Sequence, residues 1–175
     1  MARWSVACFA ALLIGSGANA LSYNISASLD GLQEVPVVVT PGTGTLTGTY
    51  DDVSNILLWS GSFSDLIGTT SDAHFHGPAA VGVSAGVQVH ITASGGGDTF
   101  PIGVTSGVFS GTATLTATQE TQLLAGLWYI NIHSSFRPGG EIRGQVSAVL
   151  APEPSAFGLL ALGLLGLARA GRRRA

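Results

Sequence analysis

The chain has 175 residues, of which 10% are charged and 25 are glycine, and it contains no lysine. This length accommodates one domain with short sorting segments, and the composition is typical of an all-β protein with many turns. Residues 21–150 hold two arginines against nine acidic residues, a formal net charge of −7, which argues against nucleic acid as a partner.

Residues 1–20 have the three parts of a secretory signal peptide. Arg3 supplies the positive start, residues 6–14 are mostly apolar, and Ala18-Asn19-Ala20 is a small-x-small cleavage site. The apolar run is too short to span a bilayer. We therefore predict export and removal of this segment, which also contains the single cysteine of the chain.

From residue 21 onward, apolar and polar residues alternate with a period of two, which predicts half-buried strands separated by Gly, Pro and Asp turns. A short helix is predicted at 118–125, with a threonine N-cap and Gly126 as the stop. Residues 21–150 are thus expected to form an antiparallel β-sandwich or Greek-key barrel of eight or nine strands with one short helix. Strands are predicted at 21–29, 44–50, 55–63, around 74–76, and at 87–91, 108–115, 127–133 and 141–150; 44–50 and 55–63 are candidates for a hairpin, and 32–36 is expected to be an edge piece or a strand end.

The last two predicted strands form a hairpin with a testable register. If the turn centres near Arg137, the numbers of paired residues sum to 274. The polar members then share one face of the sheet, which is costly to bury without mutual hydrogen bonds. We expect this face to be exposed or to form a polar site, with Glu141, Arg143 and Asn131 as candidate binding residues. The predicted pairs are His133 with Glu141, Asn131 with Arg143, and Tyr129 with Gln145.

A His-x-His pair occurs in the sequence DAHFHGP, residues 72–78. Side chains alternate along a strand, so His74 and His76 point to the same face. Our hypothesis is that His74, His76 and His133 bind Cu²⁺ or Zn²⁺, with His90 as a candidate fourth ligand. The pair resembles the His-x-His strand of copper/zinc superoxide dismutase, although four histidines cannot supply both metal sites of that enzyme. The alternative is that these histidines are structural residues held by hydrogen bonds.

Residues 151–175 read as a separate unit. Pro152-Glu153-Pro154 is followed by apolar sequence over 156–168 and then by arginines, the pattern of a C-terminal membrane anchor with a cytoplasmic basic end. Residues 152–174 resemble the PEP-CTERM sorting signal of Gram-negative bacteria. The resemblance implies transient anchoring in the inner membrane, processing by an exosortase-type transpeptidase, and a cell-surface or matrix destination beside exopolysaccharide or another envelope component. A tail that is never cleaved is the alternative.

Four stretches of the middle segment, LDGLQEVP (29–36), AHFHGPA (73–79), WYINIH (128–133) and PGGEIRGQV (138–146), occur in a characteristic order. Together they resemble the CHRD (chordin-type) domain over about residues 22–147. The resemblance implies an extracellular β-rich module, found in chordin, where repeats contribute to growth-factor regulation, and in many exported bacterial proteins. We therefore expect a structural or binding module that requires no catalysis. The alternative is a metalloprotein of the redox-enzyme type, built on the histidines.

Overall fold

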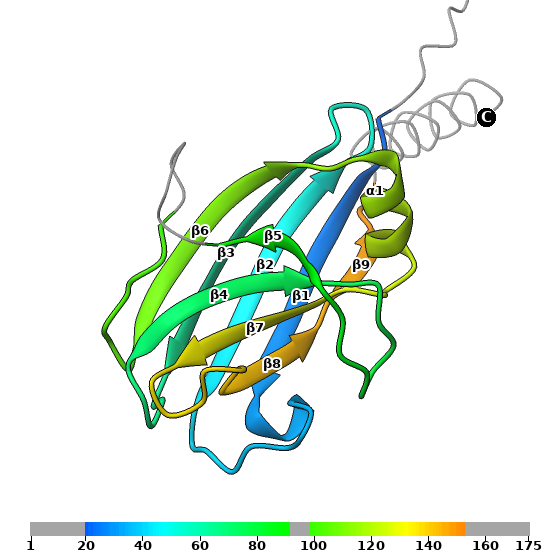
Figure 1. Cartoon of the computed structure of the whole chain (residues 1–175). Helices are drawn as coiled ribbons and strands as arrows, with labels where there is room; N and C mark the ends of the chain where they lie inside the picture. Colours follow the sequence, from blue (N-terminus) through cyan, green and yellow to red (C-terminus); the bar gives the residue numbers. More distant parts are fainter. Residues whose placement is uncertain (1–19, 92–98, 153–175) are drawn as a thin grey trace, which may run out of the picture.

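The computed structural model of the chain describes residues 20–91 and 99–152. Within these residues it contains nine strands, one α-helix and one short 3-10 helix (Figure 1). In chain order the elements are β1 (Ser22–Asp30), η1 (Gly31–Gln33), β2 (Thr43–Asp51), β3 (Ile56–Ser64), β4 (Thr70–His76), β5 (Val87–His90), β6 (Gly107–Thr114), α1 (Ala117–Leu124), β7 (Tyr129–Ser134), β8 (Ile142–Gln145) and β9 (Ser147–Leu150).

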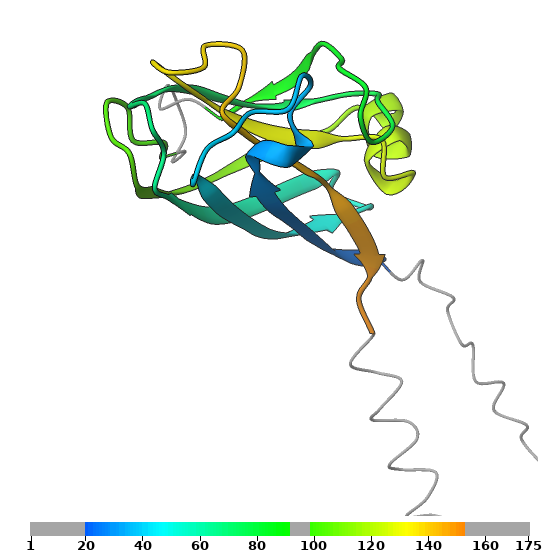
Figure 2. The same ribbon diagram turned by 90° about the horizontal axis from the view of Figure 1, so that it is seen from below.

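The strands form one antiparallel sheet that curves into a nearly closed barrel (Figure 1, Figure 2). Its hydrogen-bonded order is β5-β4-β7-β8-β1-β2-β3-β6, and β9 pairs with β1 beside this path. The predicted all-β class is confirmed, and so is the predicted hairpin, which β2 and β3 form. The pairs β4–β7, β8–β1 and β3–β6 join strands that are far apart in the sequence.

Three local features differ from the expectation. The predicted edge piece at 32–36 is not a strand, because the Asp30 carboxylate accepts hydrogen bonds from the N–H groups of Leu32 and Gln33 and turns the chain into η1. The predicted last strand is divided into β8 and β9 at Val146, whose N–H bonds to the carbonyl of Trp128. The helix starts one residue earlier than expected and is capped by a Thr116–Gln119 capping box.

The signal peptide and the apolar tail fall on residues 1–19 and 153–175, which lie outside the described residues, as do residues 92–98. Among the residues that the structure describes, no helix is both long and apolar enough to cross a membrane.

Apolar side chains from alternate strand positions fill the inside of the barrel. At its centre Trp59 meets Phe75 edge to face, with ring centroids 5.2 Å apart, and Phe75 lies 6.0 Å from Trp128. Each such aromatic pair contributes about 0.5–1.5 kcal/mol beyond the burial of its area. Phe75 thus fixes β4 from the inside, and the alternation of the strand places its neighbours His74 and His76 on the outer face.

The outer face of the barrel differs between its two sides. Along β1, β2 and β3, most outward-facing residues are exposed. Along β4, β7 and β8 both faces are largely buried, because loops fold over the outer face. Carbonyls of Val83, Ala85 and Pro138, all from these loops, accept hydrogen bonds from side chains of the outer face. The polar face predicted from the last two strands is therefore a buried layer rather than an exposed surface.

Candidate metal centre

All four histidines lie on or beside the outer face of β4. His74 is paired with Asn131 of β7 on one side and with His90 of β5 on the other. His76 is paired with Tyr129, and Asp72 with His133. The three-strand group β5-β4-β7 therefore brings together residues that lie up to 61 positions apart in the sequence.

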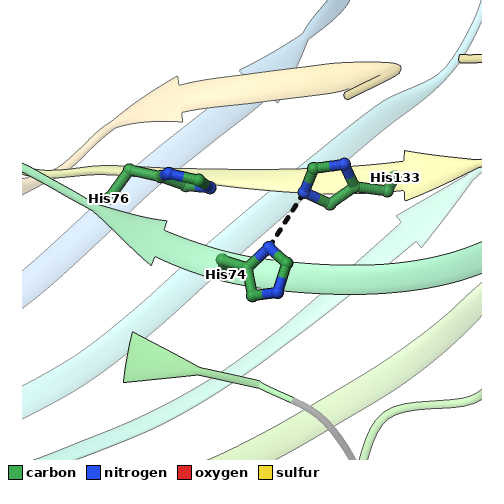
Figure 3. Close-up of side chains that lie close together, drawn as sticks. All are labelled: His74, His76 and His133. Atoms are coloured by element: carbon green, nitrogen blue, oxygen red, sulfur yellow. Dashed lines mark hydrogen bonds between the residues drawn. The ribbon is translucent and has the colours of Figure 1, made fainter. Parts of the chain in front are cut away.

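Three of the imidazole rings converge on one another (Figure 3). His74 Nδ1 lies 3.0 Å from His133 Nε2, and the ring of His76 faces the same space. One ligand atom from each of His74, His76 and His133 lies within 4.8 Å of the other two. His74 and His76 are buried and His133 is half-buried, so the group opens toward solvent on the His133 side. The structure thus assembles the three histidines that the sequence predicted as ligands.

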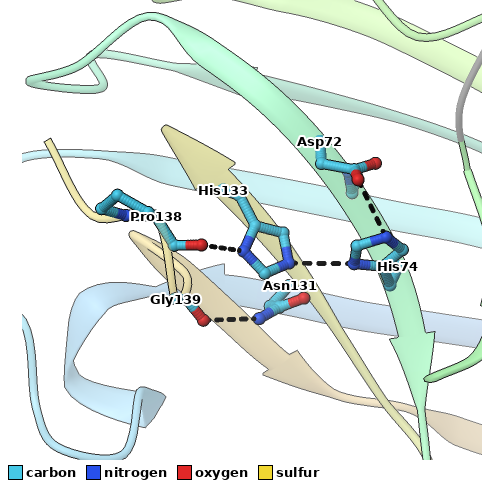
Figure 4. Close-up of polar contacts among 7 residues, drawn as sticks. Asp72, His74, Asn131, His133, Pro138 and Gly139 are labelled. Carbon is cyan, nitrogen blue, oxygen red and sulfur yellow. Dashed lines mark hydrogen bonds and ion pairs between the residues drawn. The ribbon is translucent and has the colours of Figure 1, made fainter. Parts of the chain in front are cut away.

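Loop carbonyls hold the outer nitrogens of two of these rings. His133 Nδ1 lies 2.8 Å from the Pro138 carbonyl (Figure 4), and His76 Nδ1 lies 3.0 Å from the Ala85 carbonyl. A carbonyl oxygen only accepts, so each Nδ1 carries the proton. In the neutral ring the lone pair is then on Nε2, which in His76 is buried and has no hydrogen-bond partner. Burial lowers the pKa of His76, which favours this neutral form.

His74 has an acceptor on both sides of its ring. Its Nδ1 faces the Nε2 lone pair of His133, and its Nε2 lies 3.0 Å from Asp72 Oδ2 without making a hydrogen bond (Figure 4). Burial lowers the pKa of His74 to about 4, although Asp72 raises it, so the ring is neutral at pH 7. A neutral imidazole has one proton. One of its two nitrogens therefore presents a lone pair to another lone pair.

Asn131 and Arg143, two of the predicted binding residues, lie in the same buried layer. The Arg143 guanidinium lies 3.4 Å above the centre of the Tyr129 ring and donates to the Val83 carbonyl. Tyr129 in turn stacks on His76, with ring planes 4° apart. Asn131 donates to the carbonyl of Gly139, and its own buried carbonyl oxygen has no partner. Tyr129 thus holds the ring of His76 in place, and Arg143 places one cation beside the histidines.

Glu141, the third predicted binding residue, lies elsewhere. The predicted register is confirmed for Tyr129–Gln145 and Asn131–Arg143, but the ladder ends at Ile132–Ile142, so the predicted His133–Glu141 pair is not formed. The expectation that Glu141 shares the histidine face was wrong. Its carboxylate instead accepts hydrogen bonds from two loops and from the end of β7. The donors are the hydroxyls of Thr40 and Ser134 and the N–H groups of Ile67 and Gly68.

Glu34 is a site residue that the sequence did not identify. The residue is 7% exposed, and its Oε1 has no hydrogen-bond partner. Burial raises the pKa of Glu34 to about 7, against the lowering effects of Arg143 and Asn131. Pro36 predicted an edge piece or a strand end at 32–36, whereas the chain turns through η1, with Glu34 as its C-cap. Composition and spacing gave no separate signal for it.

A scan against protein-family models finds a CHRD domain over residues 25–146 and a PEP-CTERM protein-sorting motif over residues 150–174. The chain belongs to the CHRD domain family. The CHRD domain contains all four histidines and the strands that carry them. The PEP-CTERM motif implies export, sorting to the envelope and processing by an exosortase-type system. Searches of curated proteins and of solved structures find no match to this CHRD protein.

Proposed function

We propose that this CHRD protein is a cell-surface binding module that holds a Cu²⁺ or Zn²⁺ ion between His74, His76 and His133. The single observation that carries the proposal is the convergence of three imidazole nitrogens whose opposite ring nitrogens all face an acceptor. Histidines that bind metals usually donate their other N–H to a carbonyl or a carboxylate, which orients the ring. Here the Pro138 and Ala85 carbonyls accept from His133 and His76, and the Asp72 carboxylate lies 3.0 Å from the outer nitrogen of His74.

The spacing of the nitrogens supports one shared ion. Nitrogens bound to a tetrahedral ion at about 2.0–2.1 Å are roughly 3.3 Å apart. The 3.0 Å separation of His74 Nδ1 and His133 Nε2, and the 4.8 Å limit for the whole group, lie on either side of this value. When the His74 proton is on Nε2, an ion at this position would also accept the lone pairs of His74 Nδ1 and His133 Nε2, which in that tautomer face one another. Three neutral nitrogens suit both Cu²⁺ and Zn²⁺, and water completes the coordination.

Metal analysis tests this site directly. The purified protein is stripped with a chelator, incubated with Zn²⁺ or Cu²⁺, desalted and analysed by inductively coupled plasma mass spectrometry and titration calorimetry. We expect the wild type to retain metal, and His76→Ala and His133→Ala to weaken binding about 100-fold or more, because each removes one of three ligands. The control Ser60→Ala changes an exposed serine of β3 on the other side of the barrel and should bind as the wild type does.

The structural alternative gives the opposite pattern. If the histidines only hold the loops, the wild type retains no metal after desalting, and His76→Ala changes the free energy of unfolding to the same extent with and without Zn²⁺. That result would reject the metal site and leave an exported CHRD module whose buried polar layer is purely structural.

We also propose that the tail is cleaved, so that the mature protein is released to the cell surface, where exopolysaccharide or another envelope component is its partner. The PEP-CTERM motif supports this proposal. The intact mass of protein recovered from the surface fraction should lack both residues 1–20 and the arginine cluster at 169–174. A mature chain that still ends in that cluster contradicts cleavage.

A further inference from the structure

We infer that His74 bridges two metal ions and that the second ion is bound by Asp72, His74 and His90. This inference rests on the proposed function and extends it to a dinuclear centre. Asp72, His74 and His90 form a second group whose ligand atoms all lie within 4.8 Å of one another. His74 belongs both to this group and to the group formed by His74, His76 and His133.

The two nitrogens of His74 face different groups. Nδ1 is 3.0 Å from His133 Nε2, whereas Nε2 is 3.0 Å from Asp72 Oδ2 (Figure 4). The two ring nitrogens point away from each other, so an ion bound at one leaves the other free for a second ion. The same ring can therefore be a ligand in both groups without any change in its position.

The other two ligands are placed to complete the second site. The Ala73 N–H donates to Asp72 Oδ1 at 2.8 Å, which leaves Oδ2 directed at His74. His90 is the cross-strand partner of His74 in β5, and their ring centroids are 4.7 Å apart with the planes at 82°. His90 is exposed, so its ring can rotate toward Nε2 of His74 without displacing a packed neighbour.

The protonation state of the shared His74 ring determines how the two metal ions are connected. Binding of the second ion at Nε2 displaces the remaining ring proton of His74 to solvent, so that the ring becomes an imidazolate coordinated on both sides. With metal–nitrogen bonds of about 2 Å, the two ions would be roughly 6 Å apart. The second set, with two nitrogens and one carboxylate oxygen, suits Cu²⁺ or Zn²⁺. Because two of its residues are partly or fully exposed, it should bind more weakly than the first set.

Copper titration with electron paramagnetic resonance tests the bridge. The wild type should bind two Cu²⁺ ions per chain, and spin coupling through the imidazolate should reduce the signal to well below that of two isolated ions. His90→Ala and Asp72→Asn should bind one ion, with a full signal for each ion bound. Ser60→Ala serves as the control for folding and copper handling.

The outcomes separate this inference from the proposed function. If the wild type binds a single ion that His90→Ala leaves unchanged, the second site is refuted and the three-histidine site stands. Two ions without spin coupling also refute the bridge. If neither the wild type nor any variant retains copper, and the wild type retains no zinc in the metal analysis, the proposed function itself fails.

Discussion

Glu141→Ala is expected to lower the free energy of unfolding by about 2–6 kcal/mol, because it leaves two buried or part-buried backbone N–H groups without an acceptor, at a cost of about 1–3 kcal/mol each. The side chain of Glu141 is fully buried and accepts four hydrogen bonds. Burial alone would raise its pKa, but the hydrogen bonds from Ser134, Thr40 and the backbone hold the pKa of Glu141 below its ordinary value. The carboxylate is therefore charged at pH 7.

The measurement is urea denaturation of the metal-free protein at pH 7. The truncation leaves the N–H groups of Ile67 and Gly68 without an acceptor, whereas the two hydroxyls are able to rotate toward other partners. Glu141→Gln is the matched control. It keeps the volume of the side chain and one acceptor oxygen, but it loses the charge and places an NH₂ group against some of the donors. It should therefore lower the free energy of unfolding by less than Glu141→Ala does. A loss below about 1 kcal/mol for Glu141→Ala would show that these loops do not depend on the carboxylate.

Glu34→Gln is expected to change the pH dependence of stability by about 3 kcal/mol between pH 4 and pH 8. The pKa of Glu34 is about 7 in the folded protein and 4.5 ordinarily, so the folded state binds its proton more tightly than the unfolded state does. This carboxyl therefore contributes stability that is fully present below pH 4.5 and is lost as the pH rises through about 7. Glutamine does not ionise and removes this dependence.

The test compares the wild type and Glu34→Gln by chemical denaturation, with chelator present, at pH 4 and at pH 8. All other titrating groups occur in both proteins, so they cancel in the difference between the two free energies of unfolding. The free energy of unfolding of Glu34→Gln, relative to that of the wild type, should increase as the pH rises. A difference that is the same at both pH values would mean that Glu34 ionises normally and is not confined by the buried layer.

His74 titrates with the opposite sign in the metal-free protein. Its pKa is lowered to about 4 from 6.5, so its contribution to stability is present above pH 6.5 and is lost as the pH falls toward 4. Between about pH 4.5 and 6.5 the contributions of His74 and Glu34 oppose each other. The wild type should thus have a flatter profile than Glu34→Gln, in which the acid sensitivity of His74 is no longer offset.

The strands were predictable because period-two alternation is a local property of the sequence. The same alternation placed His74 and His76 on one face, and the hairpin register placed Asn131 opposite Arg143. Register works well here because a shift by one residue would move Ile130 and Ile132 out of the core. It failed at Glu141, where the ladder had already ended and alternation no longer determined the direction of the side chain.

Long-range pairing and loop placement were not predictable from one sequence. Nothing in the residues of β4 specifies β7 rather than β3 as its neighbour, so the approach of His133 to His74 was a hypothesis without a topological basis. The groups that orient the rings of His76 and His133 are the backbone carbonyls of Ala85 and Pro138. Every residue type has a backbone carbonyl, so the sequence does not mark these two. The polar face is buried because loops cover it, and the path of a loop is not encoded in any periodic pattern of the sequence.

The pairing of β9 with β1 has a consequence for how the molecule is presented. Leu150 lies beside Tyr23, so the first and last strands of the barrel begin and finish at one pole. Asp30, at the other end of β1, is paired with Arg143 of the buried layer. The seven residue steps from Tyr23 to Asp30 along β1 separate these points by roughly 23 Å. Any tether attached after Leu150 would therefore hold the domain at the pole opposite to the Asp30–Arg143 pair.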